Sequence, residues 1–245
     1  MPSERLTVKG IVLSVINVGE ADKRLVLLTG ELGKIHVFAR GVKRPHSPFG
    51  AACDPFVFGT FEIYEGRTAY TLSGVKVQRY FEEIKKDYEA VCYGSYFLEL
   101  ADYFGRENVE AYDQVNLLYV SLVALLKAQI PRPLVRSVYE LRTLVHNGEY
   151  PEVFSCALCG KNEVLTHFSV RRNGCLCEAC APQVPGAVPV LPSAVYAMQY
   201  IVRTPLKALY SFQVTGQVQE NLSEIIGKYL DQTLDRQMKT LAFLE

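Results

Sequence analysis

The sequence predicts an α+β multidomain protein, in which a small N-terminal β-barrel is followed by an all-helical domain carrying an inserted four-cysteine module. Residues before Phe81 form short β-branched and aromatic runs between glycine turns, and the residues after it change to helical spacing. Five of the 7 cysteines lie between Cys156 and Cys180. The expected boundaries are 1–80 for the barrel, 81–150 with 182–245 for the helical domain, and 151–181 for the inserted module.

The first eighty residues contain five candidate strands. In the central one, Ile35, Val37 and Ala39 alternate with His36 and Phe38, a period of two that is typical of a strand with one exposed face. Turn residues separate the strands, which are expected at 9–18, 25–29, 35–39, 56–64 and 70–77. Five short strands in this length suggest an OB-fold, a five-stranded barrel that often binds nucleic acids.

Helical patterns occupy most of the remaining chain. The stretch 115–129 is apolar almost all round, which indicates a helix in the middle of a bundle. A four-proline stretch at 182–192 is expected to be a linker, and Ser193 is expected to cap the helix that follows it. The other helices are expected at 88–104, 134–146, 193–203 and 218–238.

The cysteine pairs Cys156-x-x-Cys159 and Cys177-x-x-Cys180 predict a structural Zn²⁺ site. Seventeen residues separate the pairs, within the range found in four-thiolate sites. Gly160 and Gly174 are expected to supply the positive φ angles of the two turns. A closed set of four thiolates holds structure and leaves no coordination position for catalysis.

Two alternatives remain open for these cysteines. Cys175 could replace Cys177 in the ligand set, and the pairs could instead form redox-active or structural disulfides. A polar N-terminus and the lack of a long apolar run predict a cytoplasmic protein without a membrane partner, and a reducing compartment favours the metal.

Positive charge gathers in the predicted barrel. Residues 1–80 carry 11 Lys and Arg against 7 Asp and Glu, although the whole chain has a formal net charge of +0. The glycine-flanked stretch 39–50 forms a basic loop that can follow a phosphate backbone. Phe38 could stack on a base or pack internally. The candidate nucleic-acid contacts are Lys23, Arg24, Lys34, Arg40, Lys43 and Arg44, with further charge from Arg67, Lys76 and Arg79.

The sequence contains no phosphate-binding loop, zinc-protease or nucleophile-elbow motif, so an enzyme is not expected. A zinc-containing adaptor, or an RNA-binding OB protein, is an alternative to a DNA-binding protein.

Three segments resemble the bacterial recombination mediator family RecO: Gly19-Glu-Ala-Asp-Lys-Arg24, Thr29-Gly-Glu-Leu-Gly-Lys34 and Ala39-Arg-Gly-Val-Lys-Arg-Pro-His-Ser-Pro48. The helical remainder and the two cysteine pairs fit the same family. The resemblance implies an OB-fold joined to a helical domain with a zinc module. It also implies that Arg40, Lys43 and Arg44 contact DNA and that Cys156, Cys159, Cys177 and Cys180 bind zinc.

The resemblance further implies a function in DNA repair at the bacterial nucleoid. RecO proteins bind single- and double-stranded DNA, anneal complementary strands, associate with RecR, and help RecA replace single-strand-binding protein. The helical domain is expected to dock the acidic, apolar tail of single-strand-binding protein. Arg171 and Arg172 form either a second DNA surface or an exposed hairpin tip.

Overall fold

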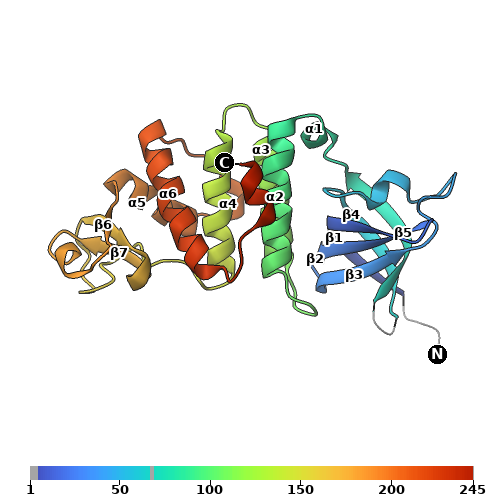
Figure 1. Ribbon diagram of the computed structural model, residues 1–245, viewed down its shortest axis with the longest axis horizontal. Coiled ribbons are helices and arrows are strands. Elements are labelled where there is room, and N and C mark those ends of the chain that lie inside the picture. The colour runs from blue at the N-terminus through green and yellow to red at the C-terminus, as the bar shows by residue number, and fades with distance from the viewer. Residues whose placement is uncertain (1–4, 67–68, 245) are drawn as a thin grey trace. The chain divides into compact units, whose positions relative to one another are not determined.

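The computed structural model describes residues 5–66 and 69–244 (Figure 1). Two compact units are present. The first comprises the chain up to Leu126 together with the segment from Met238, and the second is Lys127–Gln237. The compact units are defined by contacts among all of their elements, so they do not test the domain boundaries expected at residues 80, 150 and 181. These boundaries stay predictions.

The first unit begins with a closed five-stranded barrel, as predicted. The strands follow the order β1-β2-β3-β5-β4, with β1 also pairing with β4 and the parallel pair β3 and β5 completing the circle. β1 pairs with β4 through residues 5–11 and with β2 through residues 10–18, and a bulge between Val12 and Ser14 lets the strand bend. The strands are β1 (Arg5–Val18), β2 (Asp22–Thr29), β3 (Gly33–Ala39), β4 (Phe58–Tyr64) and β5 (Tyr70–Arg79).

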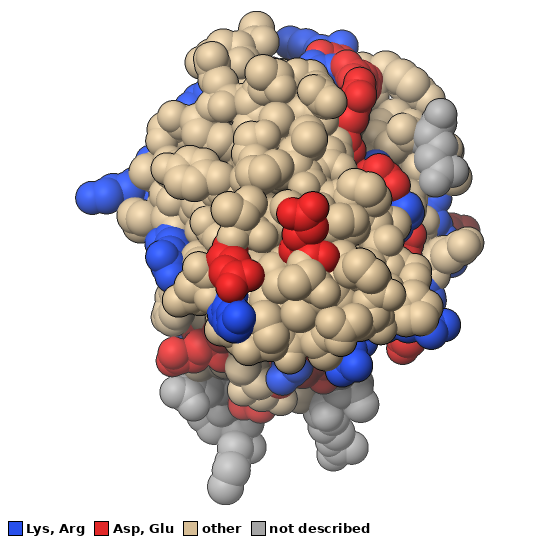
Figure 2. Space-filling view, turned by 90° about the vertical axis from the view of Figure 1, so that its left-hand side faces the viewer, with Lys and Arg blue, Asp and Glu red and all other residues tan. Residues whose placement is uncertain are grey.

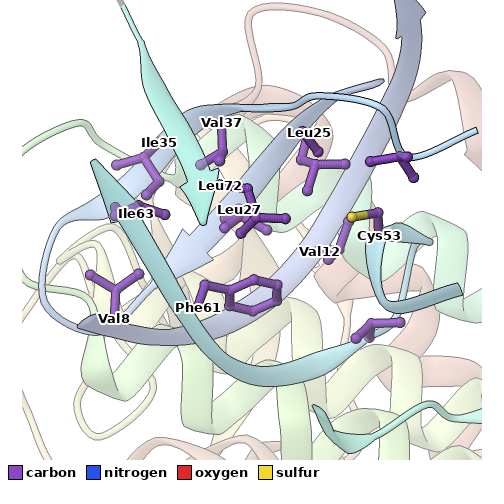
Figure 3. Packing of buried hydrophobic residues seen from close by; sticks show 13 residues of the cluster. Val8, Val12, Leu25, Leu27, Ile35, Val37, Cys53, Phe61, Ile63 and Leu72 are labelled. Carbon is purple, nitrogen blue, oxygen red and sulfur yellow. The ribbon is translucent and has the colours of Figure 1, made fainter. Parts of the chain in front are cut away.

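Alternate residues of these strands fill the barrel with apolar side chains. Val12, Leu27 and Phe61 point into the same core from three different strands (Figure 3). Ile35, Val37 and Ala39 are buried there, as the period of two predicts, whereas His36 and Phe38 are only half-buried. The alternation therefore gives β3 a buried inner face of apolar side chains and an outer face that is only half-buried.

Three helices and a short C-terminal turn complete the first unit. They are α1 (Glu82–Lys85), α2 (Tyr88–Phe104), α3 (Tyr112–Leu125) and the 3-10 helix η5 (Lys239–Phe243), while a further 3-10 helix, η1 (Gly50–Cys53), lies before β4. The side chain of Asp87 caps α2 by accepting from the Ala90 amide at 3.1 Å. α2 and α3 contact β1 and β2, so the outward cross-strand pair Ile11 and Leu28 is fully buried.

The second unit combines three helices with a small sheet of order β7-β6-β8. α4 contacts both α5 and α6, and Arg142 Nη1 donates to the carbonyls of Ile201 and Val202 at the end of α5. Its elements are α4 (Arg132–His146), β6 (Leu165–Ser169), η2 (Val170–Arg172), β7 (Gly174–Cys177), η3 (Ala181–Gln183), β8 (Val188–Pro189), α5 (Pro192–Arg203), η4 (Leu206–Ala208) and α6 (Gly216–Thr233).

Several predicted details of the helical region are wrong. Leu191, not Ser193, occupies the N-cap position of α5, and Pro192 begins the helix with its fixed φ angle. The expected linker 182–192 contains most of η3 and all of β8, which pairs with β6. α6 ends at Thr233 because the chain turns away at Leu234, which has an extended backbone. Within the described residues, no helix has the length and apolar character needed to cross a lipid bilayer.

Candidate metal centre and nucleic-acid interface

The four predicted metal ligands gather at one point of the second unit. One potential ligand atom from each of Cys156, Cys159, Cys177 and Cys180 lies within 4.8 Å of all the others. The sulfurs of Cys159 and Cys177 are 4.0 Å apart. A tetrahedral ion with sulfur ligands at about 2.3 Å requires sulfur separations of about 3.8 Å. The cluster therefore has the dimensions of a four-thiolate site.

Two tight turns aim these sulfurs. The Gly160 amide donates to the Cys156 carbonyl at 2.8 Å, and the Cys180 amide donates to the Cys177 carbonyl at 3.1 Å. Gly160 has the predicted positive φ, at 73°. The same prediction is wrong for Gly174, where a Cβ atom would instead lie 2.5 Å from the Glu152 carbonyl oxygen. Asn173 adopts the left-handed conformation there, with φ of 51°.

Cys177, and not Cys175, belongs to this cluster. The two cysteines are two residues apart on β7, and adjacent same-side positions on a strand are separated by about 6.6 Å. The Cys175 sulfur is not among the four sulfurs that lie within 4.8 Å of one another. Cys175 is fully buried away from the cluster, and burial raises the pKa of its thiol to about 12.

The cluster favours negative charge on one of its sulfurs. Burial opposes ionisation of Cys156, but hydrogen bonds from the backbone amides of Cys177, Cys159 and Leu158 lower its pKa to about 6. Hydrogen bonding with the neighbouring Cys177 thiol raises the pKa of Cys180 to about 12. Because each further negative charge in the cluster is repelled by the first, a bound cation would favour ionisation of the remaining sulfurs.

The basic loop carries three of the predicted contacts on its outer side. Arg40, Lys43 and Arg44 are exposed, and within the described residues none of them has an acidic partner. The loop base is fixed: the Gly41 amide donates to Asp22 Oδ1 at 2.7 Å, and the Lys43 amide donates to the Ala21 carbonyl at 3.0 Å. The loop backbone is therefore anchored to the β1–β2 turn, while its charges face solvent.

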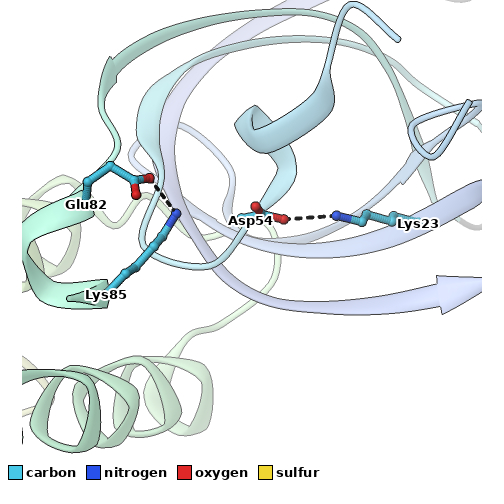
Figure 4. Close-up of polar contacts among 4 residues, drawn as sticks. All are labelled: Lys23, Asp54, Glu82 and Lys85. Carbon is cyan, nitrogen blue, oxygen red and sulfur yellow. Dashed lines mark hydrogen bonds and ion pairs between the residues drawn. The ribbon is translucent and has the colours of Figure 1, made fainter. Parts of the chain in front are cut away.

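The other three predicted contacts lie in different surroundings. Lys23 Nζ is 2.9 Å from Asp54 Oδ1 (Figure 4), and Lys34 Nζ donates to the Asp102 carbonyl at 2.6 Å. Both lysines are largely buried and already have partners. Figure 4 also shows the pair of Lys85 with Glu82 at 2.9 Å on α1. Arg24 points outward from β2, and Arg67 lies outside the described residues.

Arg171 and Arg172 are exposed in η2, between β6 and β7, which agrees with a hairpin tip. Figure 2 views the side of the molecule on which β6 and β7 lie. Uncharged side chains predominate on this face, with a few acidic groups near its middle and Lys and Arg mainly toward its edges.

Sequence reasoning missed an apolar cavity of about 410 Å³ in the second unit. It is lined by α5 from Ser193 to Tyr200, by the loop 212–215 and by the start of α6. Tyr196 is 69% exposed there, and Phe212 packs on Tyr200 with ring centroids 4.9 Å apart. The loop 212–215 contains no helix or strand pattern, so nothing in the sequence pointed to this cavity.

Comparison with known proteins agrees with these features. The domain family described as "Recombination protein O N terminal" matches residues 1–81, and "Recombination protein O C terminal" matches residues 85–242. The chain therefore belongs to the RecO family.

Curated relatives match along nearly the whole chain. A protein of Acetivibrio thermocellus named "DNA repair protein RecO" is 30% identical over 242 residues, covering 98% of this chain and 96% of the relative. A protein of the same name from Anaeromyxobacter dehalogenans is 30% identical over 246 residues, covering 99% and 96%. A third, from Caldicellulosiruptor saccharolyticus, is 28% identical over 238 residues, covering 97% and 96%.

Proposed function

We propose that this protein acts in DNA repair as a DNA-binding recombination mediator in the bacterial cytoplasm, at the nucleoid. It binds single- and double-stranded DNA, anneals complementary strands and, together with RecR, assists the loading of RecA onto DNA coated by single-strand-binding protein. The observation that carries this proposal is the anchored loop whose Arg40, Lys43 and Arg44 are exposed without acidic partners among the described residues. The family membership supports it.

The proposed mechanism requires no chemical reaction. Cations on the loop neutralise phosphates and release condensed counterions, which gives sequence-independent and salt-sensitive affinity. A bound strand with reduced charge repels a complementary strand less, so base pairing becomes easier. Lys23 and Lys34 are not needed for this step, since Asp54 and Asp102 already hold them.

We also propose that Cys156, Cys159, Cys177 and Cys180 bind one structural Zn²⁺. The sulfur separations fit a tetrahedral ion, and four thiolates leave no open position. When bound, the ion neutralises the repulsion between thiolates and ties the turn at Gly160 to the end of β7. Its contribution is therefore to the folding of this part of the second unit.

The apolar cavity beside Tyr196 is the proposed docking site for the tail of single-strand-binding protein. Tyr196, Phe212 and Val214 offer an apolar surface open to solvent. Apolar anchors of a peptide gain free energy by leaving water in such a cavity. Replacing Tyr196 by Ser should weaken binding of the tail peptide while leaving DNA binding unchanged.

Charge reversal tests the DNA-binding assignment. The variant Arg40→Glu/Lys43→Glu/Arg44→Glu should lose at least 100-fold in affinity for DNA, of the order expected when three phosphate contacts become repulsive. A matched control reverses three exposed lysines of the second unit, Lys127, Lys161 and Lys207, with the same change in net charge. Fluorescence anisotropy of labelled oligonucleotides measures both. Wild-type affinity in the loop variant, with unchanged circular dichroism, would refute the assignment.

A further inference from the structure

A row of four side chains crosses the outer surface of the barrel. Ile16 of β1 pairs with Arg24 of β2, Arg24 pairs with Phe38 of β3, and Phe38 pairs with Thr71 of β5. Residues directly opposite each other on paired strands project to the same side of a sheet. Leu25 and Val37, the neighbours of Arg24 and Phe38, fill the barrel core. The row of Ile16, Arg24, Phe38 and Thr71 therefore faces outward.

This row lies on a part of the outer surface that the helices leave open. Ile16 is 58% exposed, and Arg24 and Phe38 are each partly exposed. Farther along β1 and β2, by contrast, the outward pair Ile11 and Leu28 is fully buried. Ile16 and Phe38, which lie on either side of Arg24, thus form an accessible apolar surface with a positive charge in its middle.

Two arginines lie on or beside this surface. Arg24 forms no ion pair within the described residues, and its buried Nε has no hydrogen-bond partner there. Arg40 follows Phe38 by two residues, about 6.6 Å along the chain direction, and is also exposed without an acidic partner in the described part. Arg40 also begins the basic loop. Apolar side chains and unpaired cations therefore alternate over a short distance.

We propose that the row of Ile16, Arg24, Phe38 and Thr71 is a stacking surface for the bases of single-stranded DNA. Unpaired bases expose flat apolar faces that can lie on Phe38 and Ile16, while Arg24 and Arg40 meet the adjoining phosphates. A duplex hides its base faces and can use only the cations. The proposal rests on the proposed function and adds to it the residues that make single strands bind differently from duplexes.

The chain contains no tryptophan, so one introduced indole reports on this surface alone. In the variant Phe38→Trp, titration with an oligothymidylate should quench most of the indole fluorescence, since stacked bases quench indole. The control variant Tyr88→Trp places the indole at a position that is 79% exposed at the start of α2. Its fluorescence should change little. Equal quenching in both variants, or none in Phe38→Trp at saturating DNA, would overturn the proposal.

Affinity measurements separate stacking from charge. Phe38→Ala should weaken binding of single-stranded DNA about tenfold, the usual scale for one stacked base, and change duplex binding less than twofold. Because stacking releases no counterions, the salt dependence of single-strand binding should keep its slope. Reversing the three loop cations should instead reduce that slope by about 2, or about 0.7 for each lost phosphate contact. Ile16→Ser alters a largely exposed side chain, so it gives a second test that does not depend on tolerance of Phe38→Ala.

The outcomes distinguish this proposal from the function on which it rests. If the loop variant loses DNA binding while Phe38→Ala and Ile16→Ser bind single strands as the wild type does, the stacking surface is wrong and the DNA-binding loop stands. If Phe38→Ala weakens duplex and single-strand binding equally, stacking is also wrong. If the loop variant binds DNA normally, the loop is not the DNA-binding site and the proposed function loses the observation that carries it.

Discussion

Asp22 Oδ1 accepts a hydrogen bond from the backbone amide of Gly41 at 2.7 Å, which fixes the start of the basic loop to the start of β2. Gly41 has φ of 66°, so the chain leaves β3 in a conformation that favours glycine. The carboxylate holds the backbone at the point where the chain passes from Arg40 to Lys43.

Two substitutions of Asp22 separate its hydrogen bond from its charge. Asp22→Asn removes a negative charge near the loop but retains an oxygen acceptor, so DNA affinity should stay equal or rise. Asp22→Ala removes both, and it should bind DNA about three- to tenfold more weakly than Asp22→Asn because the loop must then be ordered on binding. Hydrogen exchange of the Gly41 amide should accelerate only in Asp22→Ala. Equal affinities for the two variants would contradict this account of the loop.

The two cysteines of β7 should differ in their effect on metal content. Cys177→Ser removes a sulfur of the cluster and should lower bound zinc from about one ion per chain to a small fraction of that. Cys175→Ala is the matched control, since it changes a buried cysteine outside the cluster and should retain the metal. Elemental analysis of the purified variants measures both. Loss of zinc from Cys175→Ala alone would reverse the assignment of these two residues.

Cys53 should make stability depend on alkaline pH. Burial in the barrel core raises the pKa of its thiol from 9.0 to about 11. In the unfolded chain the thiol ionises near its ordinary pKa, so the folded state loses stability as the pH rises from about 9 to about 11. The full difference corresponds to about 2–3 kcal/mol.

The variant Cys53→Ala provides the comparison for that prediction. The free energy of unfolding, followed by circular dichroism in denaturant, should fall more steeply in the wild type than in Cys53→Ala over this pH interval. Other groups titrate in both proteins, so only the difference between the two curves reports on Cys53. Parallel curves would show that its ionisation is not linked to folding.

Glu99 should hold the C-terminal turn on the first unit. Its carboxylate accepts from the amides of Lys239 and Thr240 at 3.0 and 2.8 Å and from the Thr240 hydroxyl at 2.6 Å. Glu99→Ala should therefore cost about 1–3 kcal/mol and increase hydrogen exchange in η5. Glu224→Ala, which removes only an exposed pair with Lys228, should cost less than about 0.5 kcal/mol. Unchanged exchange in η5 would show that Glu99 does not secure the turn.

Much of the fold follows from local patterns in the sequence. A period of two places Ile35, Val37 and Ala39 inside the barrel, because alternate residues of a strand face opposite sides. α2 has the predicted bounds 88–104, whereas α3 begins and ends before the expected 115–129, since apolar periodicity does not mark where a chain turns. The spacing of the cysteine pairs predicts their convergence, because two short turns are sufficient to aim four sulfurs at one point.

The sequence by itself determined the barrel, the helical region, the family resemblance and the candidate ligands, all of which depend on neighbouring residues or fixed spacings. Only the tertiary structure decided which of the candidate cations are free of acidic partners among the described residues and so available to contact DNA. Lys23 and Lys34 meet Asp54 and Asp102, which lie 31 and 68 positions away in the chain, whereas Arg40 meets no acid among the described residues. The row from Ile16 to Thr71 likewise depends on strand register, since pairing across a sheet is set by packing of the whole barrel and not by any one segment.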